Sequence, residues 1–248
     1  MEFEELLPFL ESRRTIRAIK PDPIPDEAVD KILEAARWAP TGFNMQPLEL
    51  IVVKDEGLRK EIKRLVDDYK NNDFYPMEAT SEAWQGHPWT MATHGTHDLP
   101  LAPVFIIFGG DTRRRVGLPM AARLSQQKGD SIFESSLSNA FMFEWLAAHS
   151  LGLAAQPVSG VKHPKVRGLV KHLLNLPDFT YVYDILLVGR PAEDSRPSGR
   201  LTGRLYEMVH RDRAADDELM SDDALRTQIV KLPAGNVARH IAADKIDR

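Results

Sequence analysis

Apolar residues recur with a helical period in five stretches of the chain. Positions i, i+3, i+4 and i+7 share one face of an α-helix, so each stretch predicts an amphipathic helix. The stretches are residues 2–11, 26–39, 58–69, 132–149 and 166–174. We expect Asp26 to cap the second helix, and Pro40 and Pro177 to end the second and the last. The helix at 132–149 is apolar around much of its circumference, which predicts a central or interfacial place.

Three short apolar, β-branched runs predict strands. The runs are Leu48–Val53, Val104–Phe108 and Tyr181–Val188. Helices around few strands indicate a layered α+β core. With 248 residues and 43% hydrophobic content, the chain is long enough to bury a sizeable core as one domain.

Composition excludes several classes of function. A formal net charge of -4 gives no global attraction to nucleic acid. The absence of cysteine excludes disulfides, a thiolate nucleophile and a thiolate metal site, and fits a reducing compartment. The acidic start Met1–Glu5 is unlike a secretory signal, and no apolar run approaches the ~20 residues of a membrane span. We therefore expect a cytoplasmic protein without nucleic-acid or membrane partners.

Familiar catalytic and nucleotide-binding motifs are missing from the sequence. No glycine-rich dinucleotide fingerprint follows the first predicted strand, and no P-loop is present. Ser135, Ser136 and Ser138 lack the glycine-flanked elbow of a hydrolase nucleophile. His94 and His97, with His87 nearby, have no acidic third ligand beside them, so we predict no metal site.

Two neighbouring segments carry the most informative chemistry. Arg13, Arg14 and Arg17 with the hydroxyl of Thr15 suit a phosphate, since guanidinium groups donate paired hydrogen bonds to phosphoryl oxygens. One predicted helix later, Ala39–Pro47 offers the hydroxyl of Thr41 and the amides of Asn44 and Gln46, which can read the edge of a planar heterocycle. Each segment alone could be an ordinary solvated turn. Together they favour one ligand with a phosphate tail and a flat polar ring.

The order of these residues resembles the FMN-dependent nitroreductase family, also called the nitroreductase-like flavoproteins. The resemblance covers about residues 8–55 and 130–210. The matching stretches are Ser12–Arg17, Pro23–Pro25, Ile32–Pro47, Leu50–Val53, Leu151–Leu153, Gln156–Gly160, Leu176–Asp178 and Leu186–Pro191.

The resemblance implies a three-layer α+β sandwich with a central, mixed but mainly antiparallel sheet flanked by helices. It implies an NAD(P)H-dependent FMN oxidoreductase that works as a homodimer, with FMN at the subunit interface. Hydride would pass by a ping-pong route from NADH or NADPH through flavin N5 to a small aromatic or conjugated acceptor, such as a nitroaromatic, quinone or enone. The cofactor carries this chemistry, so no catalytic side chain is expected.

The family pattern also assigns cofactor-binding residues. Arg13, Arg14, Thr15 and Arg17 fall at the ribityl-phosphate positions, and Thr41, Asn44 and Gln46 fall near the ring system. Pro157, Val158, Ser159 and Gly160 match the loop that passes flavin N5, where a backbone N–H contacts that atom. Many relatives have Glu at the position of Ser159, and this departure bears on substrate handling. A further cation for the phosphate is expected at Arg200, with Arg196 and Arg204 as alternatives.

Two regions outside the matched stretches are expected to vary. Residues 70–100 combine turn formers with aromatic residues, which suits a lid over a planar acceptor or a surface excursion. We expect residues 1–210 to form the FMN-binding domain. Residues 211–248 are expected to form a C-terminal arm that wraps the partner subunit, with a partly disordered tail as the alternative.

Two other functions stay open on the sequence. One is a flavin-binding or flavin-degrading protein without turnover linked to NAD(P)H. The other is an interaction module whose arginines bind a phosphorylated partner. It would purify colourless, whereas either flavoprotein would be yellow.

Overall fold

The computed structural model describes residues 2–78, 99–193, 195, 208–213, 219–221 and 223. The chain divides into two compact units. The first comprises residues 1–70 and 98–196, and the second comprises residues 71–97 and 197–248. Among the described residues, the sheet and all candidate site residues belong to the first unit.

Four strands form the sheet of the first unit, in the order β1-β2-β4-β3. They are β1 (Leu48–Val53), β2 (Val104–Asp111), β3 (Ala154–Pro157) and β4 (Thr180–Gly189). Every pairing between these strands is antiparallel, which with the flanking helices confirms the predicted α+β class. The sequence prediction missed β3, since Ala-Ala-Gln-Pro lacks the β-branched and aromatic residues typical of strands.

The helices agree with the periodic stretches, and two short helices were not predicted. The described helices are α1 (Phe3–Ser12), α2 (Asp26–Arg37), α3 (Glu56–Tyr69), α4 (Tyr75–Glu78), α5 (Met120–Arg123), α6 (Gln126–Ser150) and α7 (Pro164–Leu173). Short 3-10 helices η1 (Gly42–Asn44), η3 (Thr112–Gly117) and η4 (Ser159–Lys162) and a π-helical turn η2 (Lys70–Phe74) complete the set.

The predicted cap of α2 is corrected by the structure. Pro25 is the N-cap residue, with an extended backbone, and Asp26 is already the first helical residue. The carboxylate of Asp26 pairs with Lys54 Nζ at 2.6 Å instead of accepting a backbone N–H. An acidic residue in the first turn still stabilises the helix through its dipole.

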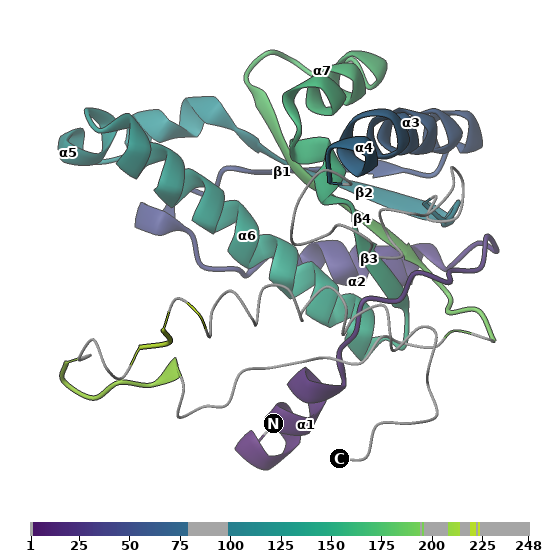
Figure 1. Cartoon of the computed structure of the whole chain (residues 1–248), viewed down its shortest axis with the longest axis horizontal. Coiled ribbons are helices and arrows are strands. Elements are labelled where there is room, and N and C mark those ends of the chain that lie inside the picture. Colours follow the sequence, from purple (N-terminus) through teal and green to yellow (C-terminus); the bar gives the residue numbers. More distant parts are fainter. Residues whose placement is uncertain are drawn as a thin grey trace. The chain divides into compact units, whose positions relative to one another are not determined.

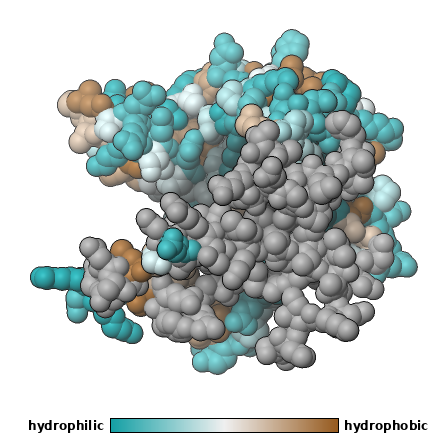
Figure 2. Space-filling view, viewed as in Figure 1, coloured by the Kyte–Doolittle hydropathy of each residue, from teal (hydrophilic) through white to brown (hydrophobic). Residues whose placement is uncertain are grey.

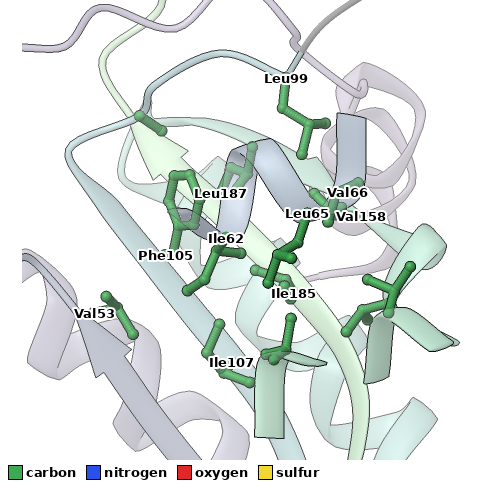
Figure 3. Packing of buried hydrophobic residues seen from close by; sticks show 14 of the residues in the cluster. Val53, Ile62, Leu65, Val66, Leu99, Phe105, Ile107, Val158, Ile185 and Leu187 are labelled. Carbon is green, nitrogen blue, oxygen red and sulfur yellow. The ribbon is translucent and has the colours of Figure 1, made fainter. Parts of the chain in front are cut away.

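Helices cover both faces of the sheet, so the first unit has three layers (Figure 1). Alternate residues of β2 face opposite sides: Phe105 and Ile107 pack against α3 and α7, whereas Ile106 and Phe108 pack against α2 and α6. Figure 3 shows the first of these clusters, with Ile62 of α3 close to the strand residues. Because alternate residues of β2 are buried in opposite layers, a slip of one residue would exchange the two faces, and the register of the strand is fixed.

Helix α6 begins six residues before the predicted start. Ser125 caps it by accepting a hydrogen bond from the N–H of Lys128 at 3.4 Å, and its first turn is polar, so the apolar pattern gave no sign of it. The predicted central position is confirmed by Phe133, Leu137 and Ala140, which are almost fully buried.

Glu144 is an exception on the buried face of α6. Its side chain is 0% exposed, and neither carboxylate oxygen has a hydrogen-bond partner. The buried residues Ala140, Phe141 and Ala148 lie four, three and four positions away on the same face, and all belong to the apolar layer shared with α2. Burial raises the pKa of Glu144 well above its ordinary value, because the ionised form loses hydration without gaining a partner.

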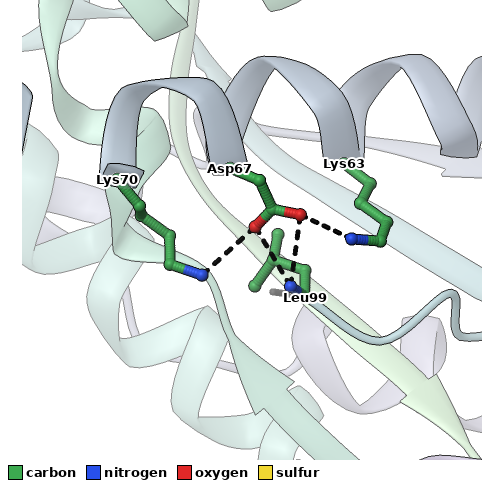
Figure 4. A network of polar contacts seen from close by, with 4 residues as sticks. All are labelled: Lys63, Asp67, Lys70 and Leu99. Atoms are coloured by element: carbon green, nitrogen blue, oxygen red, sulfur yellow. Dashed lines mark hydrogen bonds and ion pairs between the residues drawn. The ribbon is translucent and has the colours of Figure 1, made fainter. Parts of the chain in front are cut away.

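A buried carboxylate fixes the point where the chain leaves and re-enters the first unit. Asp67 on α3 accepts hydrogen bonds from Lys63 Nζ at 2.6 Å, Lys70 Nζ at 3.1 Å and the backbone N–H of Leu99 at 3.0 Å (Figure 4). Lys70 and Leu99 flank residues 71–98. The two ends of that segment are therefore held by one side chain.

Candidate functional site

The Arg13–Arg17 segment is attached to the C-terminal end of α6. It follows α1, whose last residue Ser12 has its Oγ 2.8 Å from Nε2 of His149. Phe9 packs against the same imidazole, with ring centroids 5.0 Å apart and the ring planes tilted by 35°. Burial and the positive charge of Arg13 lower the pKa of His149, which favours the neutral ring near pH 7. The sequence interpretation missed this histidine, since only tertiary packing brings it to α1.

The side chains of Arg13 and Arg14 are held in defined positions. The guanidinium of Arg13 lies 4.2 Å from the ring centroid of Trp145, a cation–π contact. Arg14 Nη1 donates to the carbonyl of Glu11 and, at 2.8 Å, to that of Arg13, so it caps the end of α1. Thr15 is half-buried and Arg17 is exposed.

Thr41, Asn44 and Gln46 form one hydrogen-bonded turn around η1. The Oγ1 of Thr41 accepts the N–H of Gln46 at 3.1 Å, and the Nε2 of Gln46 donates to the Oδ1 of Asn44 at 2.9 Å. Phe43, Asn44 and Gln46 all have positive φ, at 54°, 50° and 46°. This region is costly for residues other than glycine, and such strain concentrates at functional sites. Both amides are exposed at the surface.

Helix α6 holds this strained turn in place. Ser136 Oγ accepts the N–H of Gly42 at 3.0 Å, and Asn139 Nδ2 donates to the carbonyl of Pro40 at 3.1 Å. A side chain at Gly42 would overlap Cγ2 of Ile132, so glycine permits the close approach. The hydroxyl of Ser136 also donates to the carbonyl of Ile132 at 2.7 Å, and these two bonds define its structural role.

The Pro157–Gly160 segment begins at the last residue of β3 and runs into η4. Val158 is buried and anchors the turn, while Ser159 is exposed and Gly160 is half-buried. The N–H of Val158 donates to the carbonyl of Ile185 at 2.9 Å and to Oδ1 of Asp184 at 3.2 Å. Among the described residues, no group accepts the N–H of Ser159 or of Gly160. Two backbone donors at the start of η4 are thus available for a ligand.

Contacts with β3 and α6 connect the three predicted segments. The N–H of Ile16 donates to the carbonyl of Ala155 in β3 at 3.2 Å, which places the arginine segment beside the strand that leads into the Val158 turn. Trp145 holds the arginine segment to α6, and Ser136 holds the Thr41–Gln46 turn to the same helix. These residues are nine apart, or about 14 Å along the helix axis. This separation suits an extended ligand. Arg200 and its alternatives Arg196 and Arg204 lie outside the described residues.

Membrane and metal-binding features are also part of the sequence expectations. No helix in the described part of the chain is long and apolar enough to span a membrane. No group of three or more histidine, aspartate or glutamate side chains in that part is arranged to hold a metal ion. The predicted lid at 70–100 falls largely, and the arm at 211–248 almost wholly, outside the described residues.

Comparison with known proteins gives consistent matches. Residues 10–190 match the family model described as "Nitroreductase family". The chain is 28% identical to the FMN reductase (NAD(P)H) of Bacillus subtilis over 204 residues, which is 79% of this chain and 70% of the relative. It is 25% identical to an NADH dehydrogenase of Thermus thermophilus over 211 residues, which is 80% of this chain and 95% of the relative.

A solved structure shares the fold. It is oxidized iodotyrosine deiodinase bound to FMN and 3-iodo-L-tyrosine, with a TM-score of 0.65 and 23% sequence identity. The match covers 85% of this chain and 100% of that one.

Proposed function

We propose that this chain, which belongs to the nitroreductase family, transfers hydride from NADH or NADPH through bound FMN to a small aromatic or conjugated acceptor. The family model covers residues 10–190, and the relatives include an FMN reductase (NAD(P)H) and an NADH dehydrogenase. The protein is accordingly an FMN-containing, NAD(P)H-dependent oxidoreductase. Its acceptor and the order of the two half-reactions belong to the proposal.

The observation that carries the proposal is the strained turn at Thr41–Gln46. Its three residues with positive φ cost of order 1 kcal/mol or more each, and Gly42, Ser136 and Asn139 hold the turn against that cost. The result is a pair of exposed amides fixed relative to each other. Such an array can hydrogen-bond to the edge of a flavin ring, which has both donors and acceptors.

The other two segments also fit FMN by the chemistry of their donors. Arg14 and Arg17 are assigned to the phosphate, with Thr15 adding a hydroxyl and Arg13 lying against Trp145 at the same end of α6. The backbone N–H groups of Ser159 and Gly160 are assigned to the N5 side of the ring. When bound, FMN supplies hydride transfer at N5, and the protein contributes binding, orientation and exclusion of water.

A homodimer is part of the proposal. Large apolar side chains are exposed on or beside three helices. They are Phe3 (65%) on α1, Met120 (73%) on α5, Leu124 (81%) directly after α5, and Met142 (40%) and Phe143 (38%) on α6. Figure 2 shows hydrophobic residues at the left edge, where Figure 1 places α5. Where such side chains gather into a patch, as around α5, they are typical of an interface. Size-exclusion chromatography with light scattering measures the oligomeric state directly.

The domain organisation and the acceptor site are proposed together. Residues 1–210 would form the FMN-binding domain, residues 70–100 a lid over the acceptor, and residues 211–248 an arm on the partner subunit. Support comes from the compact first unit and from Asp67, which fixes both ends of residues 71–98. A lid with fixed ends can vary in sequence while the flavin site stays constant.

Anaerobic stopped-flow mixing tests the function. The yellow protein is mixed with NADH or NADPH, and we expect one equivalent of the nucleotide to bleach the absorbance at about 450 nm. Reoxidation is then followed with a nitroaromatic, a quinone, an enone and 3-iodo-L-tyrosine. A yellow protein that neither nucleotide bleaches would be a flavin-binding or flavin-degrading protein instead. A colourless preparation that fails to take up FMN would overturn the assignment altogether.

A further inference from the structure

A buried carboxylate lies beneath the turn assigned to flavin N5. Asp184 on β4 is 4% exposed and touches both ends of η4. Its Oδ1 accepts the N–H of Val158, the N-cap residue of η4, at 3.2 Å. Its Oδ2 lies 3.3 Å from Nζ of Lys162, the last residue of η4. One side chain thus spans the whole turn between these two contacts.

A β-bulge brings Asp184 to this position. Along the β2–β4 pair, Phe108 lies opposite Asp184 but Gly109 lies opposite Val182, so Tyr183 has no partner on β2. An extra residue of this kind re-aims the neighbouring side chains, and bulges are common beside functional sites. Gly109 is required at the bulge, since a Cβ there would lie 2.8 Å from the carbonyl of Tyr181.

The bulge residue also contacts the turn. The ammonium of Lys162 lies 4.1 Å from the ring centroid of Tyr183, so this cation is held by the aromatic ring as well as by Asp184. Burial raises the pKa of Asp184, and the charge of Lys162 opposes that shift. The N–H of Ile185 donates to the same Oδ1 at 2.8 Å. Both carboxylate oxygens are therefore occupied, and the side chain cannot turn towards solvent without losing these bonds.

The apolar side of η4 leaves the turn little freedom to slide. Val158 and Val161 are buried in the cluster with α3, and Figure 3 shows Val158 beside Val66. A Cβ on Gly160 would already touch Cγ1 of Val66 at 3.4 Å. The apolar side of η4 is packed and its two ends are fastened to Asp184, so the backbone that carries the N–H groups of Ser159 and Gly160 is held in one position.

We infer that Asp184 is a positioning residue for hydride transfer: through Val158 and Lys162 it fixes the backbone donors that face flavin N5. The inference rests on the proposed function and deepens it. It adds a residue on β4 that makes no contact with the cofactor. A displacement of about 1 Å at a reacting centre can cost about 100-fold in rate, so a device that fixes this turn has a measurable effect.

Three variants separate the contacts. Asp184→Ala removes both the hydrogen bond from the N–H of Val158 and the ion pair with Lys162. Asp184→Asn keeps an oxygen for the N–H of Val158 but loses the ion pair, and Lys162→Met loses the ion pair while keeping an apolar stem over Tyr183. Asp111→Asn is the matched control: Asp111 is also buried, at 6% exposed against 4% for Asp184, and it pairs with Arg113 at 2.7 Å at the C-terminal end of β2.

Two measurements are made on each variant as the full-length protein. Hydrogen exchange is followed at the amides of residues 158–162, with and without FMN, and stopped flow gives the rate constant for bleaching by NADPH or NADH. Asp184→Ala should speed exchange in the turn and slow bleaching about 10- to 100-fold, with FMN affinity unchanged. Asp184→Asn and Lys162→Met should show smaller, matching effects, and Asp111→Asn none on either readout.

The outcomes distinguish this inference from the proposed function. If exchange at residues 158–162 is unchanged in Asp184→Ala, or if bleaching is unchanged despite faster exchange, the positioning role is overturned. A loss of FMN affinity as large as the loss of rate would also overturn it, since the turn would then serve binding. If the wild-type protein itself is not bleached, the proposed function fails, and no assignment to flavin N5 survives. Should Asp184→Ala fail to fold, Asp184→Asn and Lys162→Met decide the question. Faster exchange and slower bleaching of similar size in both variants support the positioning role, and no change in either readout overturns it.

Discussion

Replacing Glu144 by methionine should stabilise the protein, and by more at higher pH. The glutamate is wholly buried in the apolar layer between α6 and α2, with both oxygens unpartnered. Methionine has a similar length and volume and needs no hydrogen bonds, so it should fit without strain. Replacing an unsatisfied buried polar group by an apolar group of similar shape can be neutral or stabilising.

The expected difference in the free energy of unfolding between Glu144→Met and the wild type has two parts. Even as the neutral acid, an unsatisfied buried carboxyl group costs about 1–3 kcal/mol, and this part does not depend on pH. The second part follows from the pKa of Glu144, which burial raises well above the ordinary value of 4.5. Below the ordinary value, both the folded and the unfolded state are protonated. As the pH rises further, only the unfolded state ionises, and the wild type loses between about 1 and 2 kcal/mol per pH unit until the folded-state pKa is reached.

Urea unfolding at pH 5, 6 and 7, followed by tryptophan fluorescence at constant protein and FMN concentrations, measures both parts. The free energy of unfolding of Glu144→Met should exceed that of the wild type at pH 5, and the difference should grow at pH 6. Glu144→Gln is the control, because it keeps a polar group that does not titrate. It should show the same growing difference with pH as the methionine variant. A difference between wild type and Glu144→Met that stays constant from pH 5 to 7 would refute the reasoning.

Three further predictions concern the site. The double variant Arg14→Ala, Arg17→Ala should purify without FMN, measured as lost absorbance at about 450 nm; retained colour would place the phosphate elsewhere. Gly42→Ala should lower the free energy of unfolding by about 1–3 kcal/mol through its overlap with Ile132, and a thermal melt at the wild-type temperature would contradict that contact. Phe43→Gly should relieve the positive φ and stabilise the apo-protein by up to about 1 kcal/mol; a destabilised variant would show that the aromatic ring makes a favourable contact.

Much of the fold was predictable because its elements follow their own local patterns. The boundaries of β1 agree with the apolar run Leu48–Val53, and α3 and α7 agree with their apolar stripes to within a turn. β3 was not predictable, since its four residues become a strand only by pairing with β4. The start of α6 was missed for a related reason: polar residues after Ser125 join the helix because of a cap.

The candidate site was predictable where its side chains are neighbours in sequence. Thr41, Asn44 and Gln46 lie within one turn, so their types and spacing alone indicate a common purpose. The groups that hold the site are different. Trp145 and Asp184 come from a helix and a strand far away in the sequence, and no local pattern separates them from ordinary core or surface residues.

The attachment of Lys70 and Leu99 to Asp67 has an evolutionary consequence. Since both connections are made at one carboxylate, the stretch between them can be lengthened, shortened or exchanged with little effect on the closure entropy felt by the rest of the molecule. If this stretch is the lid proposed above, a descendant could acquire a new acceptor preference by replacing one segment, while the cofactor-binding residues are inherited unchanged.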